Sequence, residues 1–240
     1  MQNHIKSILI LAILQFSICF SSEITSHTLL EGAIKRLDGV DYTMGVNITS
    51  FDNKGKSESR WFDLSVHWNL SSDKYKMIYI EETNKEANLF KAWAHHFKDY
   101  HVDKWVMLPK SKKLKEISGK KSSEKLDLSE VSIQPSILEN DAEVIAEESV
   151  NEVACYLVRV HDDDEIINIW IDSTNYMIHR KEYYNKKSKL YKKVNYDVPF
   201  NDENELKYYK AITIENIKKK TKVDIFIDTL ETKTFQNIDI

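Results

Sequence analysis

A short run of histidines and acids offers the best metal-binding chemistry in this chain. His95, His96, Asp99 and His101 place imidazole and carboxylate ligands close together in the sequence. Zinc sites draw such ligands from spacings like His-Glu-x-x-His, where both histidines lie on one face of a helix. On a strand His95 and His96 point to opposite faces, so Asp99 and His101 would have to fold back across a turn. We therefore predict a solvated hairpin tip at this place, without a metal.

The other candidate chemistry is weaker. The stretch from His161 to Glu165 is acidic enough to bind calcium, but it lacks the looped Asp-x-Asp-x-Asp-Gly spacing of an EF-hand, which favours an exposed turn. The sequence has no Gly-x-Ser-x-Gly, no glycine-rich phosphate loop and no Cys-x-x-Cys. We expect no enzyme, no metal and no cofactor.

The N-terminal residues indicate export. Lys6 precedes the apolar run 8–14, which is too short to span a bilayer, and the small polar pair Ser21-Ser22 follows. We predict a signal peptide over residues 1–21, which is cleaved, and one domain over residues 22–240.

The two cysteines allow an alternative to cleavage. Cys19 could be the lipidated residue of a lipobox, although Ile18 stands where Gly, Ala or Ser is usual. Either outcome leaves Cys155 without an obvious intrachain partner. An intrachain disulfide is therefore not expected, and the core has to stabilise the fold.

Composition and charge exclude further classes. The chain carries 34 Lys and Arg against 38 Asp and Glu, a net charge of −4. Phosphate binding needs a basic excess, so we expect no nucleic-acid partner. Only 5 glycines and 3 prolines are present, so the sequence contains no Pro-rich or Gly/Ser-rich linker.

One helix and many strands are predicted. A stripe of apolar residues at helical spacing begins after the possible caps Thr25 and Ser26 and ends before Gly39; it consists of Leu29, Leu30, Ala33, Ile34 and Leu37. The pattern then changes to period two. The predicted strands span residues 42–48, 62–68, 75–80, 89–97, 105–108, 144–150, 153–161, 166–172, 176–184, 190–198, 207–217 and 223–230.

Strands joined by polar turns without long intervening helices favour an antiparallel meander. A twisted sheet of about ten or eleven strands curls strongly toward a barrel. We predict that residues 126–140 form short helical pieces that join the two halves of the sheet and cover its concave face. The fold class is therefore mainly β.

The order of several segments carries a family resemblance. "EANLFKAW", "DKWVMLPKSKKLKEI", "VACYLVRV", "NIWIDSTNYMIHRKEYYNKKSKLYKKVNY" and "TKVDIFIDTLETKTFQNI" follow one another over most of the chain. Together they resemble the outer membrane lipoprotein-sorting protein family, bacterial periplasmic proteins related to lipoprotein carriers. The resemblance implies an antiparallel, unclosed β-barrel with short covering helices, a periplasmic location and acyl chains held on the concave side.

Period-two alternation indicates which residues would line that side. The candidate acyl-binding residues from this alternation are Tyr42, Met44, Val46, Ile48, Phe62, Leu64, Val66 and Trp68, and Trp105 is added to them as a candidate at the mouth of the cavity. The alternative is that these side chains only pack against the N-terminal helix, and Trp105 has the same two readings, at the mouth of a cavity or in the core. Trp170 lies among isoleucines and is predicted to be a core residue.

Three basic runs complete the sequence features. Residues 110–125, 186–193 and 218–222 could form one cationic face that meets anionic headgroups or a membrane transporter, or they could protect sheet edges from pairing.

The resulting prediction is a monomeric periplasmic carrier of lipid or lipoprotein acyl chains that contacts membrane surfaces transiently, with an inner-membrane transporter as a possible partner. The alternative is a sensor or accessory subunit that uses the same fold to bind a membrane protein without transport.

Overall fold

The computed structural model describes residues 24–68, 73–83, 90–98, 101–107, 113–117, 131–162, 165–197, 199–201 and 207–232. The predicted signal peptide lies outside these residues, as do Cys19 and the part of the predicted helical connection before Val131.

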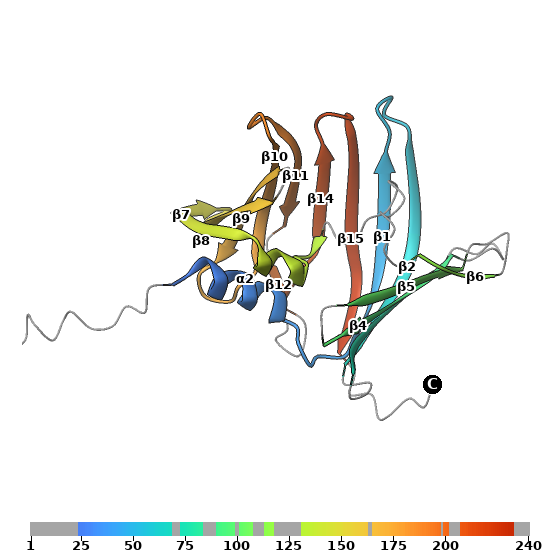
Figure 1. Ribbon diagram of the computed structural model, residues 1–240. Helices are drawn as coiled ribbons and strands as arrows, with labels where there is room; N and C mark the ends of the chain where they lie inside the picture. The colour runs from blue at the N-terminus through green and yellow to red at the C-terminus, as the bar shows by residue number, and fades with distance from the viewer. Residues whose placement is uncertain are drawn as a thin grey trace, which may run out of the picture.

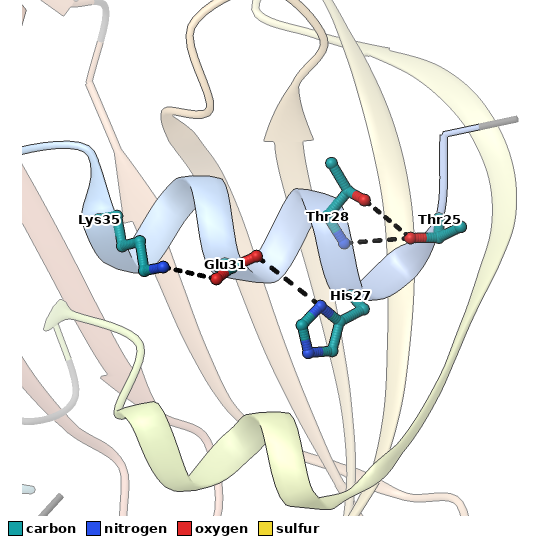
Figure 2. Close-up of polar contacts among 5 residues, drawn as sticks. All are labelled: Thr25, His27, Thr28, Glu31 and Lys35. Carbon is teal, nitrogen blue, oxygen red and sulfur yellow. Dashed lines mark hydrogen bonds and ion pairs between the residues drawn. The ribbon is translucent and has the colours of Figure 1, made fainter. Parts of the chain in front are cut away.

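The predicted N-terminal helix is confirmed as α2 (Ser26–Lys35), with Thr25 as its N-cap. The Thr25 side chain accepts a hydrogen bond from the backbone N–H of Thr28, which satisfies one of the free N–H groups of the first turn. On the exposed side, Glu31 lies 2.5 Å from Lys35 and 3.9 Å from His27, as Figure 2 shows. These polar pairs leave the opposite side of the helix free to be buried.

The strands form one large antiparallel sheet (Figure 1). In chain order its strands are β1 (Tyr42–Phe51), β2 (Ser57–Trp68), β3 (Lys74–Glu82), β4 (Lys91–Phe97), β5 (Val102–Met107), β6 (Leu114–Glu116), β7 (Asp141–Val150), β8 (Val153–Asp162), β9 (Glu165–Asp172), β10 (Ile178–Asn185), β11 (Leu190–Tyr196), β14 (Ala211–Asn216) and β15 (Thr221–Thr232). A separate pair is formed by β12 (Pro199–Asn201) and β13 (Lys207–Tyr209).

The predicted fold class is confirmed, with more strands than expected. The spatial order is β6-β5-β4-β3-β2-β1-β15-β14-β11-β10-β9-β8-β7, so the sheet is open, with β6 and β7 at its two edges among the described residues. The C-terminal strand β15 lies between β1 and β14 and joins the two halves of the chain. The stretch expected to be one strand over residues 207–217 is divided into β13 and β14, which belong to different sheets.

One face of the sheet, called here the inner face, is covered by α2 and the short 3-10 helix η2 (Pro135–Glu139). Leu29 and Leu30 of α2 are fully buried and share a hydrophobic cluster with Ile133 and with inward side chains of the strands between β8 and β2. This confirms the predicted covering role of the segment before Asn140 over its described residues. The core therefore lies between these two helices and the central part of the sheet.

Buried polar groups fix the covering segment to the sheet. Lys181 on β10 is almost fully buried, and its ammonium group donates a hydrogen bond to the backbone carbonyl of Ser132 at 2.9 Å. The hydroxyl of Tyr196 on β11 donates to the carbonyl of Val131 at 2.9 Å. Buried polar groups need such partners, so these bonds favour one position of the segment on the inner face.

The outer face carries a smaller cluster. Trp170 is buried there with Val150, Cys155 and Leu157, and its indole N–H donates to a carboxylate oxygen of Glu148 at 2.7 Å. This confirms the prediction that Trp170 is a core residue. Burial raises the pKa of the Cys155 thiol to about 11, so the thiol is kept neutral.

Candidate functional site

Eight of the nine candidate acyl-binding residues, all of those taken from alternation, lie on the inner face. In the β1–β2 register Tyr42 is opposite Val66, Met44 is opposite Leu64, and Val46 is opposite Phe62. Directly opposed residues of an antiparallel pair point to the same face, so the predicted alternation is confirmed for these strands. Ile48 and Trp68 follow at steps of two along β1 and β2 and share this face.

The eight residues differ in burial. Five of them are buried: Tyr42, Val46, Ile48, Phe62 and Val66. Met44, Leu64 and Trp68 remain partly exposed. Val46, Ile48 and Phe62 share one cluster with Leu29 and Leu30 of α2, which is the packing that the sequence left open as the alternative.

Trp105 is not brought together with the other eight residues. Trp105 is directly opposite Trp93 on β4. The same cross-strand row continues to Tyr79 on β3 and to Ser65 on β2. Ser65 neighbours Leu64 in the chain and points to the other face, so the whole row lies on the outer face. There Trp105 meets the ring of His95 edge-on, with 5.1 Å between the ring centroids.

The partly exposed inner surface continues from β2 onto β3, β4 and β5. Cross-strand rows there combine branched apolar side chains with two alanines; we call this surface the inner strip, and it consists of Leu64, Val66, Ile78, Ile80, Ala92, Ala94 and Val106. All of these residues except Val66 are partly exposed. The inner face thus has a buried part under α2 and η2 and a more accessible apolar part beside it.

Sequence reasoning missed most of the inner strip. The strands β3 and β4 were predicted, but no face was assigned to them. The alternation of Ile78 and Ile80 was a usable signal, whereas Ala92 and Ala94 give little sign of burial by residue type. Both alanines are partly exposed in the structure.

An ion pair lies at one end of the inner strip. Arg60 donates two hydrogen bonds to the carboxylate of Glu82, at 2.8 and 2.7 Å, and the guanidinium lies over the rings of Phe62 and Phe90. Glu82 is buried, and the hydrogen bond to it is the main cause that raises the pKa of Arg60. A two-point contact of this kind fixes both side chains in one geometry.

Basic side chains lie at the other end of the inner strip. Lys76 is opposite Trp68 on one side and His96 on the other, and Lys104 follows on β5 opposite Ala94. We call Lys76, His96 and Lys104 the basic cluster. The ammonium of Lys76 lies 4.7 Å from the ring centroid of Trp68, a cation–π distance.

The electrostatics of the basic cluster follow from burial and like charges. Burial, and after it the charges of Lys76 and Lys104, lower the pKa of His96 to about 4, so His96 is neutral at pH 7. Burial also lowers the pKa of Lys76, while the nearby carboxyl of Asp38 acts in the opposite direction. Asp38, from the connection after α2, brings an acidic group to this end of the strip.

The histidine-rich stretch agrees with the prediction only in part, because His95 and His96 point to opposite faces but lie within β4 and are partly buried. His95 lies on the outer face and His96 on the inner face, while His101 contacts Asp103 at 2.6 Å; Asp99 lies outside the described residues. Within the described ranges, no three His, Cys, Asp or Glu side chains are grouped so as to hold a metal ion. In the same ranges no helix has the length and apolar character needed to cross a membrane.

Comparison with solved structures identifies the fold class. A protein of the DUF1329 family from Desulfovibrio piger has a TM-score of 0.74 at 17% sequence identity, covering 88% of this chain and 93% of that one. An outer membrane lipoprotein-sorting protein domain from Vibrio parahaemolyticus has a TM-score of 0.69 at 16% identity, with coverages of 88% and 95%. A LolA superfamily protein from Nitrosomonas europaea has a TM-score of 0.61 at 14% sequence identity, covering 89% of this chain and 96% of that one. The chain therefore has the open antiparallel fold of the lipoprotein-sorting proteins, and the resemblance read from the sequence is confirmed at the level of the fold.

Sequence comparison adds the family. Residues 71–237 match a family model described only as that of an uncharacterized protein, and the chain belongs to this family. A comparison with curated proteins found no significant match.

Proposed function

We propose that this protein is a periplasmic carrier that binds acyl chains of lipids or lipoproteins on the inner strip. The observation that carries the proposal is the division of the inner face. Most of its apolar side chains are buried under α2 and η2, whereas the adjoining apolar rows of β2 to β5 remain partly exposed. A contiguous apolar surface in contact with water is unfavourable unless a ligand or partner covers it.

The chemistry at the ends of the inner strip indicates how an amphiphile would lie. An acyl chain would cover Ile78, Ile80 and the two alanines, and its polar end would reach the basic cluster. Positive charges at that end favour an acidic headgroup, either a carboxylate or a phosphate. The role is binding and delivery, with no catalytic step. Export through the N-terminal leader and delivery with an inner-membrane transporter complete the proposed role of a monomeric carrier.

Fluorescence titration with a pyrene-labelled hexadecanoic acid tests the proposal. Burial of about 15 methylene groups at about 0.8 kcal/mol each gives about 12 kcal/mol, and an association cost of about 4 kcal/mol leaves a Kd of about 1 μM. Ala92→Trp should abolish binding, because the indole would occupy the space above the strip.

The matched control is Asp63→Trp. Asp63 is exposed on the outer face, one residue before Leu64 in β2, so an indole there adds the same bulk away from the strip. Both variants should keep a cooperative thermal transition. Loss of binding in the control as well, or the absence of binding by the folded wild-type protein, would rule out the inner strip as the acyl site.

A second candidate function has its own observation. The outer face carries a cross-strand row of Tyr79, Trp93 and Trp105, with 5.4 Å between the ring centroids of the first two residues. Large aromatic side chains are enriched in protein interfaces, so this row supports an accessory subunit that binds a membrane protein. A folded protein that binds no acyl probe would favour this role.

A further inference from the structure

The hairpin turns at one end of the sheet carry an unusual concentration of lysine. The turns of β1–β2, β10–β11 and β14–β15 hold eight exposed lysines, which we call the tip lysines: Lys54, Lys56, Lys186, Lys187, Lys189, Lys218, Lys219 and Lys220. Over residues 52–56, 185–189 and 216–220 the only acidic residue is Asp52. The chain as a whole has a net charge of −4, so positive charge is concentrated on these turns.

The strand register places the three turns at the same end. Phe51, at the end of β1, is opposite Lys222 of β15, and Asn216, at the end of β14, is opposite Lys192 of β11. The strands β10, β11, β14, β15, β1 and β2 are consecutive in the sheet, and their turns lie at the upper rim in Figure 1. Two of the basic runs seen in the sequence therefore lie on neighbouring hairpins, the arrangement required by the first of the two alternatives, while the run 110–125 lies mostly outside the described residues.

Edge protection does not account for these lysines. Lysine protects a sheet when it lies on an edge strand, where unpaired backbone groups could recruit another strand. The edges of the large sheet, over the described residues, are β6 and β7, and all six strands that carry the tip lysines are paired on both sides. Edge protection, which the sequence left open as an alternative, therefore does not explain the lysines at this end of the sheet.

The turns are held in fixed shapes by polar side chains. The Asp52 carboxylate accepts hydrogen bonds from the backbone N–H groups of Lys54 and Lys56, at 2.8 and 2.9 Å. The side-chain oxygen of Asn185 accepts hydrogen bonds from the backbone N–H groups of Lys187 and Lys189, at 2.9 and 3.1 Å. The carboxylate of Asp52 is thus turned to its own backbone, and the lysines project from ordered turns.

We infer that the tip lysines form a docking surface for a lipid membrane that contains anionic headgroups. Charge complementarity favours this occupant, because each lysine near an anionic bilayer adds to the attraction. A protein partner fits less well, since lysine is depleted in protein interfaces and the tip segments lack the Arg, Tyr and Trp residues that anchor them. Ile217 adds an exposed apolar side chain beside Lys218, which suits contact with the acyl boundary. The neighbouring β8–β9 turn carries Asp162 and Glu165 and limits the surface on that side.

Co-sedimentation with vesicles tests this inference independently of acyl binding. Vesicles with about 30 mol% phosphatidylglycerol in phosphatidylcholine should bind the full chain at least about tenfold more strongly than pure phosphatidylcholine at about 50 mM NaCl. Binding should be lost at about 0.5 M NaCl, where charges are screened over a few ångströms.

Matched variants separate a specific surface from net charge. The triple variant Lys186→Gln, Lys187→Gln and Lys189→Gln should lower vesicle binding by at least about tenfold, since each lysine contributes about a fivefold change. The control Lys113→Gln, Lys115→Gln and Lys207→Gln removes the same charge from exposed sites just before β6, on β6 and on β13, and should bind like the wild type. An equal loss of vesicle binding in the control would overturn the inference. Vesicle binding by the folded wild type that does not depend on phosphatidylglycerol would also overturn it, and would leave an acidic protein surface as the partner.

Discussion

Replacement of Gly32 by alanine tests how closely α2 approaches the sheet. A Cβ atom at Gly32 would lie 2.6 Å from Cγ and Cδ1 of Tyr176 and 2.9 Å from its Cε1. Tyr176 lies in the turn between β9 and β10, so this contact connects the covering helix to the end of the sheet. Separations this short require the helix or the ring to move.

Two opposing effects decide the sign of the change. Alanine favours a helix over glycine by about 1 kcal/mol, whereas overpacking of a close contact costs about 1–3 kcal/mol. We expect Gly32→Ala to lower the free energy of unfolding by about 1 kcal/mol in the wild-type background. In a Tyr176→Ala background the clash is absent, so the same substitution should raise the free energy of unfolding by up to about 1 kcal/mol.

Urea unfolding followed by circular dichroism measures both substitutions and the double variant. The difference between the two backgrounds, about 2 kcal/mol, is the coupling between Gly32 and Tyr176. Tyr176→Phe is the matched control, because it keeps the ring and removes only the hydroxyl, so the clash should persist. The same effect of Gly32→Ala in all three backgrounds would show that α2 does not contact this ring.

Two further predictions concern the basic cluster. The pKa of His96 is held at about 4, below its ordinary value of 6.5, so the unfolded chain takes up the proton first as the pH falls. The free energy of unfolding should therefore decrease between pH 6.5 and 4, by up to about 3 kcal/mol from this group. Urea titrations at several pH values should show that His96→Gln removes this part of the pH dependence. An unchanged pH dependence in the variant would contradict the lowered pKa of His96. Lys76→Gln should weaken hexadecanoate binding about tenfold and leave hexadecanol binding unchanged, whereas Lys91→Gln on the outer face should change neither. Equal loss for both ligands would count against a headgroup contact at this cluster.

Period-two alternation predicted much of the fold and part of the site. The residues from Tyr42 to Trp68 were assigned to the correct face because neighbouring side chains of a strand point to opposite sides whatever the strand packs against. The helical stripe containing Leu29 and Leu30 was read correctly for a similar reason, since a 3.6-residue period is a local property. Trp170 was recognised as a core residue from its apolar neighbours.

The surroundings of those faces could not be read in the same way. Trp105 was grouped with the inward residues, yet the register of β4 and β5 places it on the outer face beside His95. Register between strands depends on the turn that joins them, and a shift of one residue reverses every side chain. The tip lysines show the same limit, because their distance from the sheet edges depends on the spatial order of all the strands.

The sequence by itself determined the class of fold and the direction of side chains within single strands, because both depend on local periodicity. Only the tertiary structure decided which part of the inner face is buried by α2 and η2 and which part remains accessible on β2 to β5. It also brought Lys76, His96 and Lys104 together from three successive strands. Such proximity follows from strand pairing and from where the covering helices pack, and no spacing within one segment records it.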